Sequence, residues 1–305
     1  MGLKIIKPGI FTTLQSVGLP GHRAIGIGPG GAMDPVAVRL VNALIGNADT
    51  AVALEMHYPA PELRFDYDTV FALGGADLNA ELNGNPVGNW RRYKAAAGST
   101  LVFRERTKGQ KTYLAVPDGF RRDSRPGEPA ERITEAARLE IAGSVRPGPS
   151  SRSRISRSLV PVYSRFPTVR VLEGPEFGRL TQESKSELFS GQFSVSNESD
   201  RMGYRLSGAR LEVTDATEML STAVCFGTIQ LLPDGDLIAL MADHQTTGGY
   251  PRIAQVVSVD LPLLGQLGPQ NKVAFHPIGL GEAEALAIRF ERDLAVLRAA
   301  VRLHG

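Results

Sequence analysis

Short apolar runs separated by turn-forming residues recur through the first 120 positions of the chain. The runs at 70–73, 100–103 and 112–116 have the length and the β-branched or aromatic content of strands. Asn83-Gly84 is a dipeptide that tight hairpin turns favour. The pattern therefore predicts mainly β structure in this part of the chain.

One amphipathic helix is expected among these strands. Asp34 is a good N-cap residue, and Pro35 suits the first helical position, where a missing N–H costs nothing. Apolar side chains recur at helical spacing over 38–45, and Gly46-Asn47 ends the pattern.

The second half repeats the alternation of short strands and turns. Strands are expected at 168–172, 192–196, 210–213, 227–232, 237–241, 252–259 and 272–275, with helices at 175–189 and after Asp260, which would cap the helix. A mainly β (α+β) fold of barrels or barrel-like sandwiches follows from this pattern.

A C-terminal amphipathic helix over 282–303 is expected to close on the second domain. Its apolar stripe consists of Leu286, Phe290, Leu294, Leu297 and Val301. We interpret this stripe as packing within the chain rather than as a groove for a partner helix.

Residues 121–165 interrupt the strand pattern with Arg, Ser and Pro, apart from a possible short helix at 131–139. An Arg/Ser-rich segment suits either a nucleic-acid-binding arm or a solvated linker. The linker is favoured, because acidic residues precede the basic ones and no aromatic side chain is interleaved with them. We therefore predict a domain over 1–120, a linker over 121–165 and a second domain over 166–305.

Composition narrows the class of protein. Hydrophobic residues make up 42% and charged residues 22% of the 305 positions, and the net charge is +2. These values are ordinary for a soluble globular protein, and they predict no recruitment of nucleic acid or of an anionic membrane. Cys225 stands alone, so we expect a small buried hydrophobe and no disulfide within the chain. We find no apolar run long enough for a signal peptide or a membrane span, and we expect a cytoplasmic protein.

A polar turn at residues 243–250, between two predicted strands, is the best candidate for a binding site. Its paired glycines let a backbone approach a ligand closely, and its amide, hydroxyl and phenol groups can orient one. The residues assigned to these roles are Gln245, Thr246, Thr247 and Tyr250 for orientation and Gly248 and Gly249 for admission. Asp243 would accept ligand N–H groups, and Arg201 or His244 would face a carboxylate or an oxyanion. A structural clasp is the alternative interpretation of the same turn.

Two further groups of residues extend this candidate site. Gly74, Gly75 and Asp77, at the end of a strand, are expected to close its other side. The loop before Asp34 contains Gly28, Gly30 and Gly31, whose N–H groups suit an anion-binding nest. This loop matches a dinucleotide-binding pattern, but no strand leads directly into it, so we reject that interpretation. The five histidines lack metal-site spacing, and no metal site is predicted.

Several ordered motifs resemble those of one protein family. They are Ile6–Gln15, Gly31-Ala-Met-Asp-Pro35, Asn42–Asn47, Ala53-Leu-Glu55, Gly74-Gly-Ala-Asp77, Trp90-Arg91, Glu173-Gly-Pro-Glu-Phe177, Ser199-Asp-Arg-Met-Gly-Tyr-Arg-Leu206 and the run from Met241 to Ala254 around the polar turn. The set is similar to the allophanate hydrolase subunit 2 family, which contains KipA, the C subunit of 5-oxoprolinase and the second half of the urea carboxylase carboxyltransferase domain.

The resemblance implies a fold of two cyclophilin-like β-barrels and a partner, a KipI-like subunit-1 homologue that shares the active site. A small amide or carboxylate is the implied substrate. No cofactor is expected on this chain alone, and ATP, or biotin carried by a partner, would act in the complex. Three functions remain open: a subunit of an ATP-dependent 5-oxoprolinase, a carboxyltransferase component of a urea carboxylase-type enzyme, or a KipA-like regulatory binding protein.

This chain departs from the family pattern at four places. Gly30 replaces a serine, His244 replaces an arginine, and Ser221-Thr222 replaces Ser-Glu. A glycine-rich loop that the family carries between the two halves is missing from residues 118–160. These departures make catalytic activity a weaker prediction than the fold.

Overall fold

The computed structural model describes residues 2–122, 131–143, 154–215, 217 and 219–303. The chain forms two compact units. Unit 1 comprises Met1–Gly18, Asp34–Val162 and Phe290–Gly305, and unit 2 comprises Leu19–Met33 and Tyr163–Arg289. None of the described helices is both long and apolar enough to cross a membrane.

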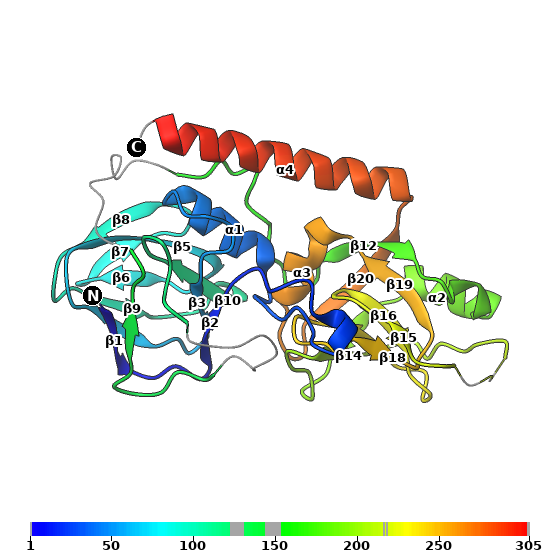
Figure 1. Ribbon diagram of the computed structural model, residues 1–305. Helices are drawn as coiled ribbons and strands as arrows, with labels where there is room; N and C mark the ends of the chain where they lie inside the picture. Colours follow the sequence, from blue (N-terminus) through cyan, green and yellow to red (C-terminus); the bar gives the residue numbers. More distant parts are fainter. Residues whose placement is uncertain (1, 123–130, 144–153, 216, 218, 304–305) are drawn as a thin grey trace. The chain divides into compact units, whose positions relative to one another are not determined.

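Unit 1 is built of two antiparallel sheets with orders β11-β1-β4-β9-β6-β7 and β2-β3-β10-β5-β8 (Figure 1). Their strands are β1 (Gly2–Lys7), β2 (Thr12–Gln15), β3 (Ala53–His57), β4 (Glu62–Phe65), β5 (Thr69–Asp77), β6 (Ala80–Leu82), β7 (Asn85–Val87), β8 (Arg92–Ala95), β9 (Thr100–Phe103), β10 (Lys108–Ala115) and β11 (Arg138–Glu140). Alternating apolar residues of both sheets, such as Phe65, Phe71 and Leu114, form one buried core.

The helix predicted near Asp34 is confirmed as α1 (Pro35–Leu44). The Asp34 carboxylate accepts a hydrogen bond from the Ala37 amide at 2.8 Å, and Pro35 occupies the first helical position. The apolar face of α1 is buried against the sheet of β5 and β10.

Unit 2 contains a closed barrel in the order β12-β19-β16-β17-β14-β13-β20, in which β12 and β20 pair in parallel. The strands are β12 (Thr168–Glu173), β13 (Phe193–Val195), β14 (Gly203–Ser207), β16 (Thr228–Leu231), β17 (Leu237–Leu240), β19 (Arg252–Val256) and β20 (Lys272–Pro277). A separate ribbon joins β15 (Thr222–Ala223) to β18 (Thr247–Gly248). The helical segments are η1 (Arg23–Ile25), η2 (Phe177–Arg179), α2 (Gln182–Ser190), η3 (Ser258–Asp260) and α3 (Leu261–Gly265).

The predicted mainly β class is confirmed, since the described residues form four α-helices and many short strands. The closed barrel is in unit 2, whereas the strands of unit 1 form two sheets. Three local predictions were wrong. Residues 131–143 contain β11 rather than a helix, 210–213 contribute only an isolated bridge at Val213, and Asp260 pairs with Arg170 instead of capping α3.

The boundaries also differ from the predicted ones. The segment expected to be a linker contributes β11, which pairs with β1 in unit 1, and residues 123–130 and 144–153 lie outside the described residues. Leu19–Met33 belongs to unit 2 although it precedes α1 in the sequence.

The C-terminal helix, α4 (Leu280–Leu303), does not close on the second domain alone, as expected from the sequence. Its last part belongs to unit 1, where Arg39 donates to both carboxylate oxygens of Glu291 at 2.6 Å. Arg298 pairs with Asp49 in the same unit. These ion pairs, together with the fully buried Leu294, fix the end of α4 on unit 1.

Candidate functional site

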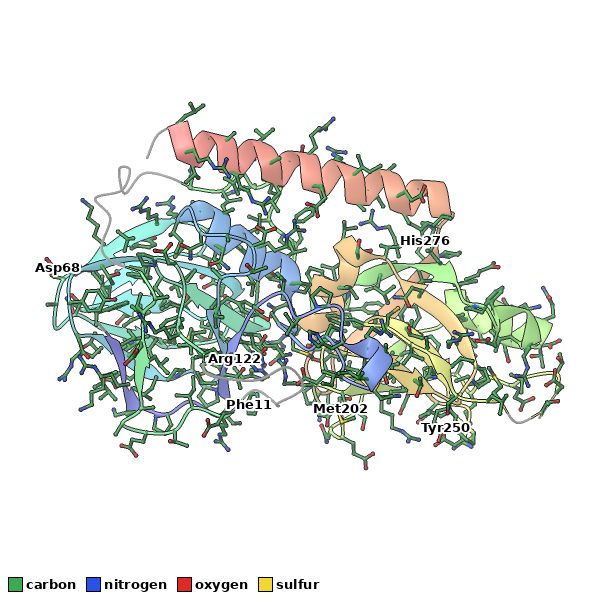
Figure 2. The ribbon with its side chains drawn as sticks, in the orientation of Figure 1. Phe11, Asp68, Arg122, Met202, Tyr250 and His276 are labelled. Atoms are coloured by element: carbon green, nitrogen blue, oxygen red, sulfur yellow. The ribbon has the colours of Figure 1, made fainter. Side chains whose placement is uncertain are left out.

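The polar turn lies between β17 and β19, as predicted, but it is more than a hairpin loop. Thr247 and Gly248 form β18, which pairs with β15 and thereby fixes the middle of the turn. Gln245, Thr247 and Tyr250 remain exposed. Figure 2 labels Tyr250 and Met202 among the side chains of unit 2, where they are 44% and 52% exposed. A fixed backbone with exposed amide, hydroxyl and phenol groups suits ligand binding.

Gln230 lies directly beneath this turn and was missed by the sequence analysis. Its Nε2 donates to the carbonyl oxygen of Tyr250 at 3.0 Å, and its side chain is fully buried. A Cβ atom at Gly248 would lie 2.7 Å from that Nε2 atom. Gly248 is therefore required for contact with Gln230, whereas the nearest atoms to a Cβ at Gly249 are 3.6 Å away.

Asp243 and Arg201 were expected to contact ligand groups of opposite charge, but they pair with each other. Arg201 Nε donates to Asp243 Oδ2 at 2.6 Å, and Nη2 donates to Oδ1 at 3.0 Å. Arg201 Nη2 also donates to the carbonyl oxygen of Gly31 at 2.5 Å. The neighbouring Asp200 is not the partner of Arg201, because its Oδ1 accepts from the amides of Met202 and Gly203.

The glycine loop that the sequence analysis singled out lies next to this ion pair. A Cβ atom at Gly28 would lie 2.9 Å from the carbonyl oxygen of His244, and one at Gly30 would lie 3.7 Å from Asp243 Oδ1. Gly30 and Gly31 both have positive φ angles, which glycine adopts readily. The structure thus brings the predicted nest together with Asp243, His244 and Arg201, all within unit 2.

His244 is almost completely buried, with 2% of its surface exposed. Its Nδ1 lies 2.5 Å from the carbonyl oxygen of Gln245, and because that oxygen only accepts, Nδ1 carries the proton. Burial lowers the pKa of His244, and the nearby charge of Arg23 lowers it further. The ring is therefore neutral near pH 7, with Nε2 as a hydrogen-bond acceptor.

A bidentate ion pair holds the C-terminal end of the turn. Arg252 donates to Glu176 from Nε at 2.9 Å and from Nη2 at 2.7 Å. These hydrogen bonds lower the pKa of Glu176. Gly174 approaches the Arg252 carbonyl so closely that a Cβ would lie 2.1 Å from its oxygen. The pairing of Glu176 with Arg252 was also missed, although Glu176 lies in a family motif.

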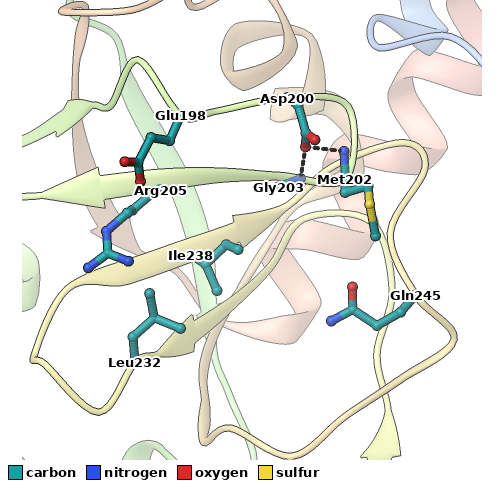
Figure 3. Close-up of a pocket in the computed structure, with 8 residues that line it drawn as sticks. All are labelled: Glu198, Asp200, Met202, Gly203, Arg205, Leu232, Ile238 and Gln245. Atoms are coloured by element: carbon teal, nitrogen blue, oxygen red, sulfur yellow. Dashed lines mark hydrogen bonds between the residues drawn. The ribbon is translucent and has the colours of Figure 1, made fainter.

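A pocket of about 260 Å³ opens beside the polar turn (Figure 3). Its floor comes from the outer face of β14 and β17, and its lining consists of Glu198, Asp200, Met202, Gly203, Arg205, Leu232, Ile238 and Gln245. Figure 3 shows Gln245 on the opposite side of the pocket from Glu198 and Arg205. The pocket thus connects the family motif that begins at Ser199 with the polar turn.

The remaining predicted site residues belong to unit 1. Gly74 and Gly75 lie in β5, where a Cβ at Gly74 would lie 2.5 Å from both Trp90 and Val41. Asp77 is exposed at the end of β5, and its Oδ1 accepts from the Asn79 amide at 3.2 Å. Close packing accounts for Gly74, and a role for these three residues in ligand binding stays a prediction.

Two other features bear on chemistry. Cys225 is exposed rather than buried, and its Sγ donates to Gln255 Oε1 at 3.2 Å, so the predicted buried hydrophobe was wrong. Among the described residues, no group of three or more His, Cys, Asp or Glu side chains is placed to hold a metal ion.

Comparison with known proteins supports the family resemblance. Residues 25–277 match the family model described as carboxyltransferase domain, subdomain A and B. The chain is 34% identical to the C subunit of the Escherichia coli 5-oxoprolinase, with 99% of each chain covered, and 33% identical to the C subunit of the Haemophilus influenzae 5-oxoprolinase, with 94% of each covered. It is 28% identical to a putative urea carboxylase of Emericella nidulans, of which it covers 25%.

Solved structures show the same fold. The crystal structure of the Kluyveromyces lactis urea carboxylase superposes with a TM-score of 0.89 over 97% of this chain and 29% of that one, at 23% identity.

Proposed function

This chain belongs to the carboxyltransferase-domain family, and we propose from that membership that it is a subunit of an ATP-dependent 5-oxoprolinase-like amide hydrolase. The observation that carries the proposal is the extent of the match. Relatives named as the C subunit of 5-oxoprolinase align over 94–99% of their length, whereas the urea carboxylase and urea amidolyase relatives align over 17–25% of theirs. Nearly every part of the 5-oxoprolinase subunits therefore has a counterpart in this chain, which is not so for the larger enzymes.

The proposed reaction opens the lactam ring of 5-oxoproline to give glutamate. One water adds across the amide C–N bond, so that the carbonyl carbon gains the oxygen and the nitrogen gains a proton. ATP hydrolysis supplies the driving force. A developing oxyanion at the carbonyl requires hydrogen-bond donors. Arg201 already donates to Asp243 and Gly31, which supports an active site completed by another chain.

We propose a KipI-like homologue of subunit 1 as that other chain, acting with this one in the cytoplasm. The relatives are named as subunits, which supports a multi-chain enzyme. The sequence contains no Gly-x-x-x-x-Gly-Lys-Ser/Thr phosphate loop and no Met-Lys-Met biotin-attachment context. ATP, or biotin in the alternative function, would accordingly enter through the complex. The ligand would lie beside the polar turn, near Gln245, Thr247 and Tyr250.

Reconstitution tests this proposal directly. The chain is co-expressed with the candidate subunit-1 homologue and the other subunits encoded nearby, and complex formation is followed by size exclusion. We expect 5-oxoproline-dependent ATP hydrolysis by the complex and almost none by the isolated chain. Elution as independent species, or a complex that hydrolyses ATP without responding to 5-oxoproline, contradicts the proposal.

Carboxyl transfer in a urea carboxylase-type enzyme is the second candidate function. It is favoured by the fold shared with urea carboxylase and by the family model itself. Biotin-dependent turnover in the same reconstitution would select it. Complex formation without turnover of either kind would select a KipA-like regulatory role.

A further inference from the structure

The charged donors near the polar turn are already engaged. The guanidinium of Arg201 donates to Asp243 and to the carbonyl oxygen of Gly31. Arg205, at the edge of the pocket, donates from Nε to Asp236 at 3.1 Å and also pairs with Asp234. Arg252 is held by Glu176. An anionic ligand group here would have to displace an internal carboxylate from one of these arginines.

The buried atoms that lack partners are, by contrast, acceptors. Among the described residues, His244 Nε2 and Gln230 Oε1 have no hydrogen-bond partner, although their side chains are 2% and 0% exposed. The role of each atom is fixed by its neighbour in the same side chain, because His244 Nδ1 and Gln230 Nε2 both donate to carbonyl oxygens. Buried unpaired acceptors are costly unless something donates to them.

The pocket in Figure 3 has the same character. Its uncompensated charged groups are the exposed carboxylates of Glu198 and Asp200. Ile238, on its floor, is the direct cross-strand neighbour of Gln230. His244 adjoins Gln245, which lines the other side. Carboxylates at the rim and unpaired acceptors beneath therefore belong to one corner of unit 2.

We infer that this corner binds its ligand through N–H groups, amide or cationic, and that it does not hold a carboxylate. The loop nest and Arg201 suggested an anion site from the sequence, but their pairing in the structure reverses the sign of the ligand. The apolar floor formed by Met202, Leu232 and Ile238 suits a small ligand with a short hydrocarbon part.

For the proposed function, on which this step rests, the inference assigns an end of the substrate to this chain. 5-Oxoproline has one lactam N–H and one carboxylate. Glu198 and Asp200 would repel the carboxylate and accept from the N–H group, which also becomes an ammonium when the ring opens. The nitrogen side would thus face unit 2, and the carboxylate would face donors elsewhere in the complex.

The first test does not depend on the proposed function. Met202 lines the pocket and is half exposed, so its methyl group, labelled with carbon-13, reports on binding. We expect a saturable shift of this signal with methylguanidinium and none with acetate. The double variant Glu198→Gln/Asp200→Asn should weaken methylguanidinium binding by about fivefold or more. The amide oxygen that Asp200→Asn introduces can still accept from the Met202 and Gly203 amides, so the loop should keep its conformation.

Glu212→Gln is the matched control, because Glu212 is an exposed carboxylate of unit 2 outside the pocket. It should leave methylguanidinium binding unchanged. A Met202 shift with acetate at equal or lower concentration, no shift with methylguanidinium, or equal weakening by the control overturns the inference.

The second test uses the reconstituted complex. The lactone analogue of 5-oxoproline has a ring oxygen in place of the N–H group, and we expect it to compete at least about tenfold more weakly than the lactam. Equal competition overturns the orientation while leaving the proposed function intact. If the complex does not act on 5-oxoproline at all, the proposed function fails, and the methylguanidinium result still decides the N–H inference.

Discussion

Two polar clusters, one in each unit, differ in whether their hydrogen bonds are complete. In unit 1, the hydroxyl of Tyr113 donates to Glu55 Oε2 at 2.8 Å and accepts from the Asp34 amide at 2.9 Å. All three residues have no exposed surface. In unit 2, His244 Nε2 and Gln230 Oε1 have no partner among the described residues. Both clusters contain family motifs, so membership of a motif does not separate a structural role from a binding role, whereas completeness of the hydrogen bonds does.

The complete cluster should be the more damaging one to open. Tyr113→Phe removes one hydroxyl and leaves a buried carboxylate and a buried amide without that contact. We expect a loss of about 2–4 kcal/mol in the free energy of unfolding, measured by chemical denaturation. The matched control is Tyr250→Phe, whose hydroxyl belongs to a side chain that is 44% exposed. That variant should change stability by no more than about 0.5 kcal/mol. Similar losses for the two variants would remove the distinction between the clusters.

A smaller loss is expected where the polar turn meets the barrel. Gly248→Ala places a Cβ 2.7 Å from Gln230 Nε2, so the turn must shift. We expect a loss of about 1–3 kcal/mol in stability, together with reduced partner-dependent turnover.

Combining Gly248→Ala with Gln230→Ala tests the cause. The second substitution removes the clashing group, so the double variant should lose less stability than the sum of the single ones. Additive losses would show that Gly248 is required for another reason.

The exposed side chains of the turn sharpen the comparison further, because they should affect binding but not folding. Gln245→Ala and Thr247→Ala should leave the melting temperature within a few degrees. Each should reduce ligand binding or partner-dependent turnover at least about tenfold, or ~1.4 kcal/mol. If both variants unfold early while the remaining folded protein binds normally, the turn is a structural clasp.

The sequence was sufficient for features that depend on neighbouring residues. The cap at Asp34, the strands on either side of the polar turn and the ordered family motifs all have local patterns. The glycine loop was also correctly singled out, although its contacts with Asp243 and His244 are distant in sequence.

Pairing over long separations was not accessible in this way. Arg201 has Asp200 beside it in the sequence, yet it pairs with Asp243, because folding brings the two turns together and leaves Asp200 to accept from nearby amides. β11 has too few residues to stand out from the polar segment around it, and it is a strand because β1 offers an unpaired edge. The unpaired acceptors of Gln230 and His244 become visible only when every neighbouring donor is known.

The smallest expected effect concerns a closed contact within unit 2, the pair of Glu176 and Arg252 at the end of the polar turn. The side chains are 13% and 20% exposed, so Glu176→Gln should cost about 1 kcal/mol near pH 7, measured by chemical denaturation. Because hydrogen bonds from Arg252 lower the pKa of Glu176 below its ordinary 4.5, the folded state favours the ionised carboxylate. Its contribution is complete above pH 4.5 and is lost as the pH falls through the lowered pKa. The stability difference between the two proteins should therefore shrink on acidification, and a difference that stays constant down to about pH 3 would show that Glu176 acts through packing alone. Ligand binding by the folded variant at pH 7 should match that of the unmodified chain, since this pair holds the turn without leaving an atom open to a ligand.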